Sequence, residues 1–188
     1  MLLSESSVNS EGGLKIRIIF VHVDYVRYYI KTKTKVAESI AVKKDYMEEC
    51  VVLFCCAEKI DEDNQHNVIE NATLEVIRRL EMIKTKKVMI YPYAHFTNDL
   101  SNPETAIEIL TGLESSLKER DIEVKRAAFG WYKELEMRSK GHPLSNLSIT
   151  IFSDKKQKSG TFCPSHSNQV EIHDQPISHS CRVKCYNA

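Results

Sequence analysis

Hydrophobic and polar residues alternate along much of the chain between positions 15 and 152, with the period of two that is typical of β-strands. Other stretches, such as "CVVLFCCA", are apolar throughout, which is typical of a strand buried on both faces. We therefore expect β-strands in seven segments: 15–25, 26–35, 48–58, 86–95, 122–129, 130–138 and 144–152.

Two segments have the helical period instead. The first covers residues 66–84, and the second begins after Ser101 or Asn102, either of which can cap a helix that has Pro103 at its first position. Strands outnumber helices, so we expect an α/β or α+β fold in which two amphipathic helices cover a sheet as a single pair of layers. The expected apolar stripes are Ile69, Ala72, Val76, Leu80 and Ile83 in the first helix, and Ala106, Ile109 or Leu110, Leu113 and Leu117 in the second.

Composition divides the chain into three parts. Residues 1–14 are rich in Ser and Gly and indicate a flexible leader, residues 15–150 form one domain, and residues 151–188 are poor in aliphatic residues. We expect that last part to be a mostly disordered tail. Its cysteines and histidines are spaced only loosely like zinc ligands, so we expect no metal site from Cys163, His166, His173, His179, Cys181 and Cys185.

Charge and hydropathy limit the classes of function. The 188 residues carry a formal net charge of +0, which argues against coating nucleic acid by bulk electrostatics but leaves room for a local pocket that binds one RNA end. No secretory leader and no apolar run of about 20 residues is present in the sequence, so we expect no membrane span. We expect a cytoplasmic protein whose six cysteines are free thiols.

Lys133 is the first candidate for chemistry, because it shares a face of its strand with Trp131, Leu135 and Met137. A buried ammonium is costly. Either its stem packs on the strand while the amine reaches water, or the lysine is held in a partly apolar pocket, where it stabilises a developing negative charge. The pattern leaves both interpretations open.

Two further motifs end strands. In "YPYAH", Pro92 ends a buried strand and is followed by Tyr93, Ala94 and His95, at a sheet edge of the kind that binds ligands. The histidine could equally cap a turn. In "HVDY", Asp24 ends a buried strand and could simply cap the turn after it. The sequence contains no Walker loop, G-x-S-x-G elbow or Rossmann fingerprint.

Four longer stretches carry a resemblance. They are "VHVDYVRYYI", "MEECVVLF", "VMIYPYAHFTNDLSNPETAIEIL" and "LKERDIEVKRAAFGWYKELEMRSKGHPLSNLS", in this order over roughly residues 15–150. Together they resemble the N-terminal editing domain of archaeal-type threonyl-tRNA synthetase. The resemblance implies a mixed sheet, similar to the fold of D-aminoacyl-tRNA deacylases, and a homodimer.

The resemblance also implies an activity, namely hydrolysis of the ester that joins serine wrongly to the acceptor end of tRNA(Thr), without a cofactor. Serine lacks only a methyl group relative to threonine, and one such group gives a pocket only about 10- to 200-fold discrimination. Carried over by position, the catalytic residues are Lys133, His95 and Tyr132. The residues expected to bind the substrate are Pro92, Tyr93, Ala94, Phe129 and Gly130.

Three positions carry a less definite, accessory role. His22 and Asp24 match the first-strand motif, and Asn146 stands thirteen residues beyond Lys133, where the family usually has a glutamate. The aminoacylation and anticodon-binding domains of such synthetases are absent from the sequence. We therefore expect either a free-standing factor that edits in trans or a truncated synthetase. Two alternatives stay open: a catalytically weakened module that docks on a separate synthetase subunit, and a D-aminoacyl-tRNA deacylase.

Overall fold

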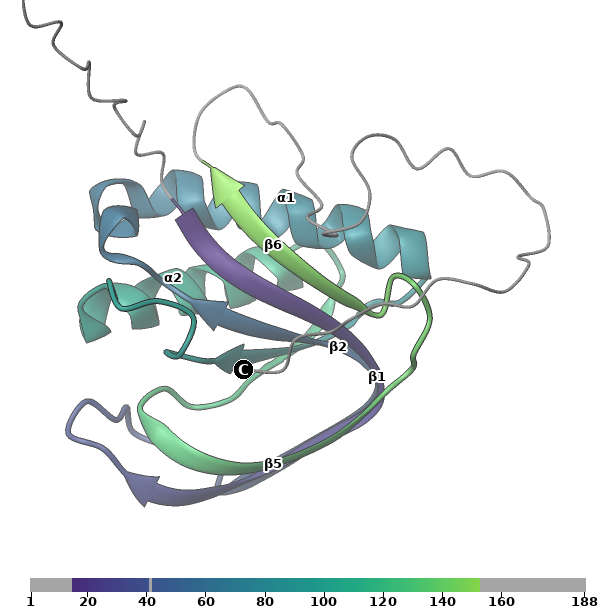
Figure 1. Cartoon of the computed structure of the whole chain (residues 1–188), viewed down its shortest axis with the longest axis horizontal. Helices are drawn as coiled ribbons and strands as arrows, with labels where there is room; N and C mark the ends of the chain where they lie inside the picture. Colours follow the sequence, from purple (N-terminus) through teal and green to yellow (C-terminus); the bar gives the residue numbers. More distant parts are fainter. Residues whose placement is uncertain (1–14, 41, 153–188) are drawn as a thin grey trace, which may run out of the picture.

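The computed structural model describes residues 15–40 and 42–152, and all structural statements concern this part of the chain (Figure 1). Six strands, one short 3₁₀ helix (η1) and two α-helices follow each other along it. In chain order they are β1 (Lys15–Lys33), β2 (Lys44–Cys56), η1 (Lys59–Asn64), α1 (Gln65–Ile83), β3 (Lys87–Pro92), α2 (Pro103–Lys118), β4 (Glu123–Arg126), β5 (Trp131–Ser139) and β6 (Asn146–Phe152).

The strands form one mixed sheet in the order β4-β3-β2-β1-β5, and β6 also pairs with β1. The β2–β3 and β3–β4 pairs are parallel, whereas β1 is antiparallel to β2, β5 and β6. Figure 1 shows α1 and α2 on the same face of the sheet. The predicted α+β fold, a mixed sheet with two helices, is confirmed.

Strand β1 is one continuous strand of 19 residues where the sequence predicts two. Its first part pairs with β6 up to Val21, and its second part pairs with β5 from Val23 onward. The register with β5 shifts between Val23 and Tyr25, so Asp24 is a bulge that bends the strand without ending it. On the face of β1 that belongs to the second apolar cluster, the bulge moves the buried positions from odd numbers, Val21 and Val23, to even numbers, Val26 and Tyr28. Such a change of phase resembles a boundary between two strands.

The sheet buries side chains on both of its faces, so the expected single pair of layers is incomplete. On the helix side, β1, β2 and both helices form one apolar cluster, which includes Ile18, Leu53, Val76 and Leu113. Beyond the bulge, β1 and β5 curve away from the helices (Figure 1). A second cluster lies there on the opposite face, made of Val23, Val26, Tyr28, Met47, Cys50, Val52, Phe54, Met89, Tyr91 and Ala127 among others.

Local signals fix the helix ends. The Asn102 side chain accepts a hydrogen bond from the Thr105 N–H at 2.8 Å, and Pro103 follows it, so Asn102 is the cap of α2. Helix α1 begins after Asn64, whose side chain accepts from the Asn67 N–H. It ends at Lys84, which has a left-handed backbone conformation.

The sequence predicts a tail from residue 151 onward, and this start is too early because β6 continues to Phe152. The leader 1–14 and residues 153–188, with Cys163, Cys181 and Cys185, lie outside the described residues. Cys50, Cys55 and Cys56 are buried free thiols, and burial raises the pKa of Cys50 to about 12. Among the described helices, none is both long and apolar enough to cross a bilayer.

Candidate active site

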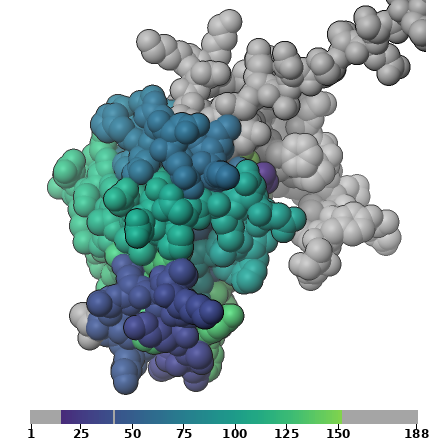
Figure 2. All heavy atoms as spheres, turned by 90° about the vertical axis from the view of Figure 1, so that its left-hand side faces the viewer, coloured from purple at the N-terminus to yellow at the C-terminus, as the bar shows by residue number. Residues whose placement is uncertain are grey.

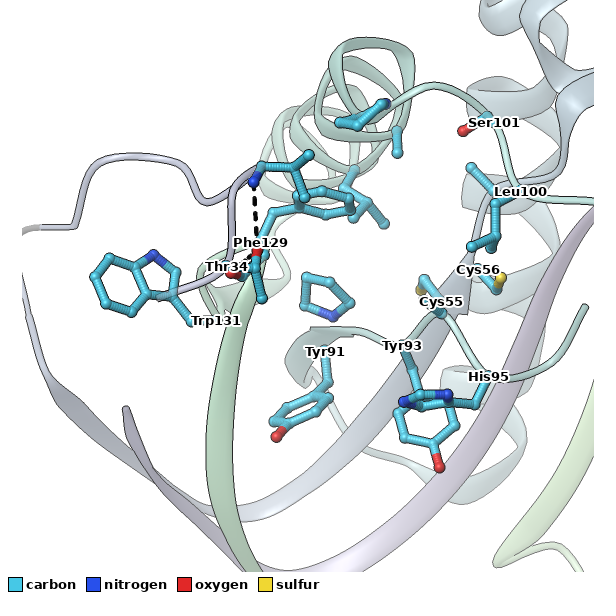
Figure 3. A pocket seen from close by; sticks show the side chains of 18 of the residues that line it. Thr34, Cys55, Cys56, Tyr91, Tyr93, His95, Leu100, Ser101, Phe129 and Trp131 are labelled. Carbon is cyan, nitrogen blue, oxygen red and sulfur yellow. Dashed lines mark hydrogen bonds between the residues drawn. The ribbon is translucent and has the colours of Figure 1, made fainter. Parts of the chain in front are cut away.

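A pocket of about 420 Å³ opens at the carboxyl ends of the parallel strands β2 and β3. Residues at the end of β2, the loop after β3, the start of α2 and the turn before β5 line it. Figure 3 shows Tyr91, Tyr93 and His95 along one side, with Thr34 and Phe129 across from them. The crevice beyond the carboxyl ends of parallel strands is where open sheets commonly bind ligands.

Lys133 lies in this pocket, with its side chain half-buried. Its Nζ atom donates hydrogen bonds to the carbonyl oxygens of Ala128 at 2.7 Å and Trp131 at 3.0 Å. Burial lowers the pKa of Lys133 to about 8, and the nearby carboxylate of Glu38 opposes that shift. The sequence left open whether the amine of Lys133 reaches water or is held in a partly apolar pocket. In the structure it is held against the pocket wall.

The "YPYAH" loop forms the side of the pocket beyond β3. The Tyr93 N–H donates to the Cys55 carbonyl at 2.9 Å, which ties the loop to the end of β2. The Tyr93 ring packs edge-on against the His95 ring, with 5.1 Å between the ring centroids. His95 is exposed, and no hydrogen bond joins its imidazole to another described residue. Pro92 and Ala94 also line the pocket.

The turn before β5 forms another wall. Gly130 has a positive φ of 70°, and a Cβ there would lie 2.6 Å from the Val36 carbonyl oxygen and from Ala37 Cα. Only glycine fits this close approach. Phe129 lines the same wall. Tyr132 also lines the pocket, but 65% of its surface is exposed, because it alternates with Lys133 along β5.

The three accessory residues do not line the pocket. His22 is buried at the bend of β1, where its Nδ1 lies 2.7 Å from Nε2 of His142. At the same bend, Asp24 pairs with Lys140 at 2.7 Å.

Asn146 pairs with Val21 on β1, whereas Lys133 pairs with Ile30. Nine residues of strand between these partners amount to about 30 Å along β1. Within this chain Asn146 therefore lies away from the pocket, because β5 and β6 pair with different halves of β1, and its accessory role stays a prediction. The pattern along single strands does not reveal this register.

The sequence pattern did not indicate Tyr91 or Glu38 as residues of the site. The Tyr91 ring lies under the Lys133 ammonium, 5.1 Å from Nζ to the ring centroid, but in the sequence it is one more apolar residue of a buried strand. Glu38 binds the turn before β5 from outside the pocket. One signal could have found it: Glu38 is the only acid between Asp24 and Asp45, in a stretch with five lysines.

No group of three or more His, Cys, Asp or Glu side chains suited to a metal ion occurs within residues 15–40 and 42–152. The polar groups of the pocket wall, all on described residues, do not make up a metal site of this kind. The wall offers one ammonium, one imidazole and the hydroxyl groups of tyrosine, threonine and serine in a largely apolar space. Such a set can hold a small polar group and stabilise negative charge on it.

The family model described as the archaea-specific editing domain of threonyl-tRNA synthetase matches residues 16–151. The chain belongs to this family.

Several similar proteins are named threonine–tRNA ligase. The threonine–tRNA ligase of Methanococcus aeolicus is 42% identical over 161 residues, which cover 86% of this chain and 24% of that protein. The threonine–tRNA ligase of Methanoculleus marisnigri is 43% identical over 137 residues, covering 72% and 22%. The chain thus spans about a quarter of the length of these relatives. A solved structure described as a probable eukaryotic D-amino acid tRNA deacylase matches 73% of this chain and 100% of its own, with 13% identity and a TM-score of 0.47.

Proposed function

We propose that this pocket hydrolyses the ester bond between serine and the 3′ end of tRNA(Thr) and so removes serine attached in error. Membership of the editing-domain family supports proofreading as the task. The observation that carries the proposal is the desolvated ammonium of Lys133 inside a pocket large enough for an aminoacyl ester. His95 and Tyr93 bound that pocket on the opposite side from the turn that holds the lysine.

The reaction needs stabilisation of an oxyanion. Water adds to the ester carbonyl and gives up a proton, the carbonyl oxygen becomes negative, and the bond to the ribose oxygen then breaks as that oxygen takes up a proton in return. A lysine ammonium has three N–H donors, and the Ala128 and Trp131 carbonyls engage two of them, which leaves one for the oxyanion or for the attacking water. Loss of one such donor typically costs about 10² to 10³ in rate. In the proposed arrangement His95, whose ring is free of hydrogen bonds from described residues, contacts the aminoacyl group, and Tyr132 borders the ribose at the mouth.

The apolar wall sets the size limit on the substrate. Phe129, Ala94 and Pro92 lie around the space, and Gly130 adds no side chain to it. We propose that these residues, with Tyr93, hold the serine side of the ester. Rejection of threonine then depends on space for a single methyl group, which is worth about 1–3 kcal/mol in an apolar pocket.

The acceptor end of tRNA(Thr) is the proposed partner, charged by a threonyl-tRNA synthetase catalytic subunit. The names of the relatives support this pairing. The proposed homodimer rests on the family resemblance alone, and analytical ultracentrifugation across a concentration series decides it.

A deacylation assay tests the proposal. The protein is incubated with seryl-tRNA(Thr), threonyl-tRNA(Thr) and a D-aminoacyl-tRNA, alongside Lys133→Ala and the matched control Lys31→Ala. Lys31 carries the same charge on β1 but is exposed and paired with Glu134. We expect release of serine alone, reduced at least about 100-fold by Lys133→Ala and unchanged by Lys31→Ala. Release of only the D-residue would assign a D-aminoacyl-tRNA deacylase, and no release from any substrate would leave a binding module.

A further inference from the structure

The connection between β1 and β2 binds the turn that carries the pocket wall. We call residues 34–40 the strap and residues 127–131 the pocket turn. The Gly130 carbonyl accepts from the Thr34 N–H at 3.1 Å and from Thr34 Oγ1 at 2.5 Å. The Trp131 indole donates to the Glu38 carbonyl at 2.9 Å. The strap belongs to the end of the molecule that lies farthest from α1 (Figure 2, dark blue), and these bonds fix it to the pocket turn.

The side chain of Glu38 is the charged part of this contact. Its Oε1 accepts from the Phe129 N–H at 2.5 Å. Both of its oxygens accept from the Arg126 guanidinium, at 2.7 and 3.1 Å, and Arg126 Nε donates to Glu114 of α2 at 2.9 Å. All three charged side chains are less than one fifth exposed, so solvent screens them weakly. Glu38 is therefore held firmly between α2 and the pocket turn.

One peptide unit joins this carboxylate to Lys133. The Phe129 N–H that binds Glu38 and the Ala128 carbonyl that binds the Lys133 ammonium belong to the same planar peptide group. In a trans peptide these two groups point in opposite directions. The carboxylate therefore lies at the positive end of the peptide dipole, and the ammonium lies at its negative end. Hydrogen bonds in such a chain polarise and strengthen one another.

We propose that Glu38 is a positioning residue for Lys133: through the Ala128–Phe129 peptide it sets the orientation of the carbonyl that holds the ammonium, and hence where the ammonium meets the ester. This inference rests on the function proposed above. A lysine side chain has a flexible four-carbon stem, so its ammonium keeps one position only when its hydrogen-bond acceptors are themselves fixed. The Glu38 carboxylate fixes the first acceptor, the Ala128 carbonyl, by binding the N–H of the same peptide group. The second acceptor is the carbonyl of Trp131, and the indole of Trp131 is held by its hydrogen bond to the Glu38 carbonyl.

The charges that face the ammonium are few. Tyr91 of β3 lies beneath it and is neutral at physiological pH, and burial raises its pKa further, to about 12. Tyr28 of β1 packs against Tyr91 and is likewise neutral. Among the described residues, Glu38 is the charged group whose field shifts the pKa of Lys133. Arg126 is hydrogen-bonded to Glu38 and so is linked to Lys133 only through that carboxylate. Removing the Glu38 charge therefore lowers the pKa of Lys133 further as well as loosening its position.

The test is Glu38→Gln, which keeps the shape of the side chain and removes its charge. A neutral acceptor makes a weaker bond to the Phe129 N–H and loses the ion pair with Arg126. We expect kcat for seryl-tRNA(Thr) to fall about tenfold or more with little change in KM, since a displaced group costs rate rather than binding. The pH at which Lys133 titrates, followed by NMR of the Cε carbon in protein labelled with ¹³C-lysine and with Lys133→Arg to assign the signal, should fall below that of the wild type.

Two matched controls remove the same charge elsewhere. Glu114→Gln leaves the Glu38–Arg126 pair in place, and Glu134→Gln changes the exposed neighbour of Lys133 in the sequence. Both should leave the Lys133 titration where it is in the wild type. An unchanged titration and unchanged kcat in Glu38→Gln would overturn the proposal, as would an equal effect of Glu134→Gln.

If Glu38→Gln does not fold, Glu38→Asp carries the test. It keeps the charge but is one methylene shorter, so it cannot reach the Phe129 N–H and Arg126 together; a lower kcat supports the proposal, and wild-type kcat overturns it. The NMR titration needs no hydrolysis. If the wild-type protein hydrolyses none of the substrates, the proposed function is wrong. The NMR titration still tests the role of Glu38 in that case.

Discussion

The Nζ atom of Lys133 lies 5.1 Å from the centroid of the Tyr91 ring, on the side of the sheet that faces away from the helices. A ring at this distance attracts a cation by about 0.5–2 kcal/mol. Burial is the larger effect, since a fall in pKa from 10.5 to about 8 corresponds to roughly 3 kcal/mol. The pocket therefore keeps an ammonium that is only partly compensated and is available to a developing negative charge.

The pKa of Lys133 predicts how hydrolysis depends on pH. If the ammonium is the active form, the enzyme-dependent kcat/KM, after subtraction of spontaneous ester hydrolysis, falls as pH rises through about 8. Lys133→Arg stays charged over this range, so it should be slower but lose this decline, because a guanidinium differs in shape and does not deprotonate. A rate that climbs through pH 8 in the wild type would identify the neutral amine as a base instead.

The same residue should limit stability. The folded-state pKa lies below the usual value of 10.5, so the penalty on the fold is present in full below about pH 8 and disappears as pH rises to about 10.5. Lys133→Met removes the penalty but leaves two carbonyls without a donor, so we expect a net gain of about 1 kcal/mol in unfolding free energy at pH 7.

Urea denaturation at pH 7 and pH 10 measures this gain, which should shrink at the higher pH. Lys31→Met, at an exposed and ion-paired position, is the control and should change little. A loss of stability in Lys133→Met at pH 7 would mean that the hydrogen bonds to Ala128 and Trp131 outweigh the desolvation.

Two glycines with nearly the same backbone angle should respond differently to alanine. Gly130 and Gly141 have φ values of 70° and 71°, so alanine brings backbone strain of about 1–2 kcal/mol at each. Only at Gly130 does the new Cβ also meet backbone atoms of the strap, at 2.6 Å, whereas nothing lies within 4 Å at Gly141. We expect Gly130→Ala to cost about 3 kcal/mol or more and to impair hydrolysis, and Gly141→Ala to cost about 1 kcal/mol. Equal losses in chemical denaturation would contradict the close approach of strap and pocket turn.

Much of this architecture follows from local pattern. The alternation in β5 correctly separates Lys133 from the exposed Tyr132, and the Asn102–Pro103 signal begins α2 where the structure begins it. These features depend on residues two to four positions apart. The residues of "YPYAH" and of the turn before β5 meet in one pocket because β2, β3 and β5 converge there, and their catalytic and binding roles stay a prediction.

The features that the sequence pattern did not reveal depend on the pairing register between strands that are far apart in the sequence. The bulge at Asp24 makes one bent strand read as two, and the pairing of β5 and β6 with different halves of β1 separates Asn146 from Lys133. The role of Glu38 depends on a contact 91 positions away along the chain. No period within a segment encodes such contacts, so sequence analysis finds the lysine but not the group that orients it.

The bend of β1 contains a pair of histidines that predicts acid sensitivity. The pKa of His22 is lowered by burial, and then by the charges of His142 and Lys140, while Glu49 and Asp24 oppose the shift. The folded state therefore prefers neutral His22, and the unfolded chain binds more protons below its own pKa of about 6.5. Stability supplied by this site is present above that pH and is lost as pH falls below it.

Thermal unfolding between pH 7.5 and 5.5 tests this expectation with two variants. The wild type should lose Tm from this site as the pH falls through this range, because the unfolded chain takes up a proton that the buried His22 resists. His22→Asn removes the buried imidazole and should flatten the pH dependence, even if its Tm at pH 7.5 is lower. His66→Asn changes a histidine whose side chain is 88% exposed, and it should follow the wild-type curve. If both variants keep the wild-type slope, the acid sensitivity belongs to the carboxylates of the domain, and the close contact between His22 and His142 carries no proton-linked stability.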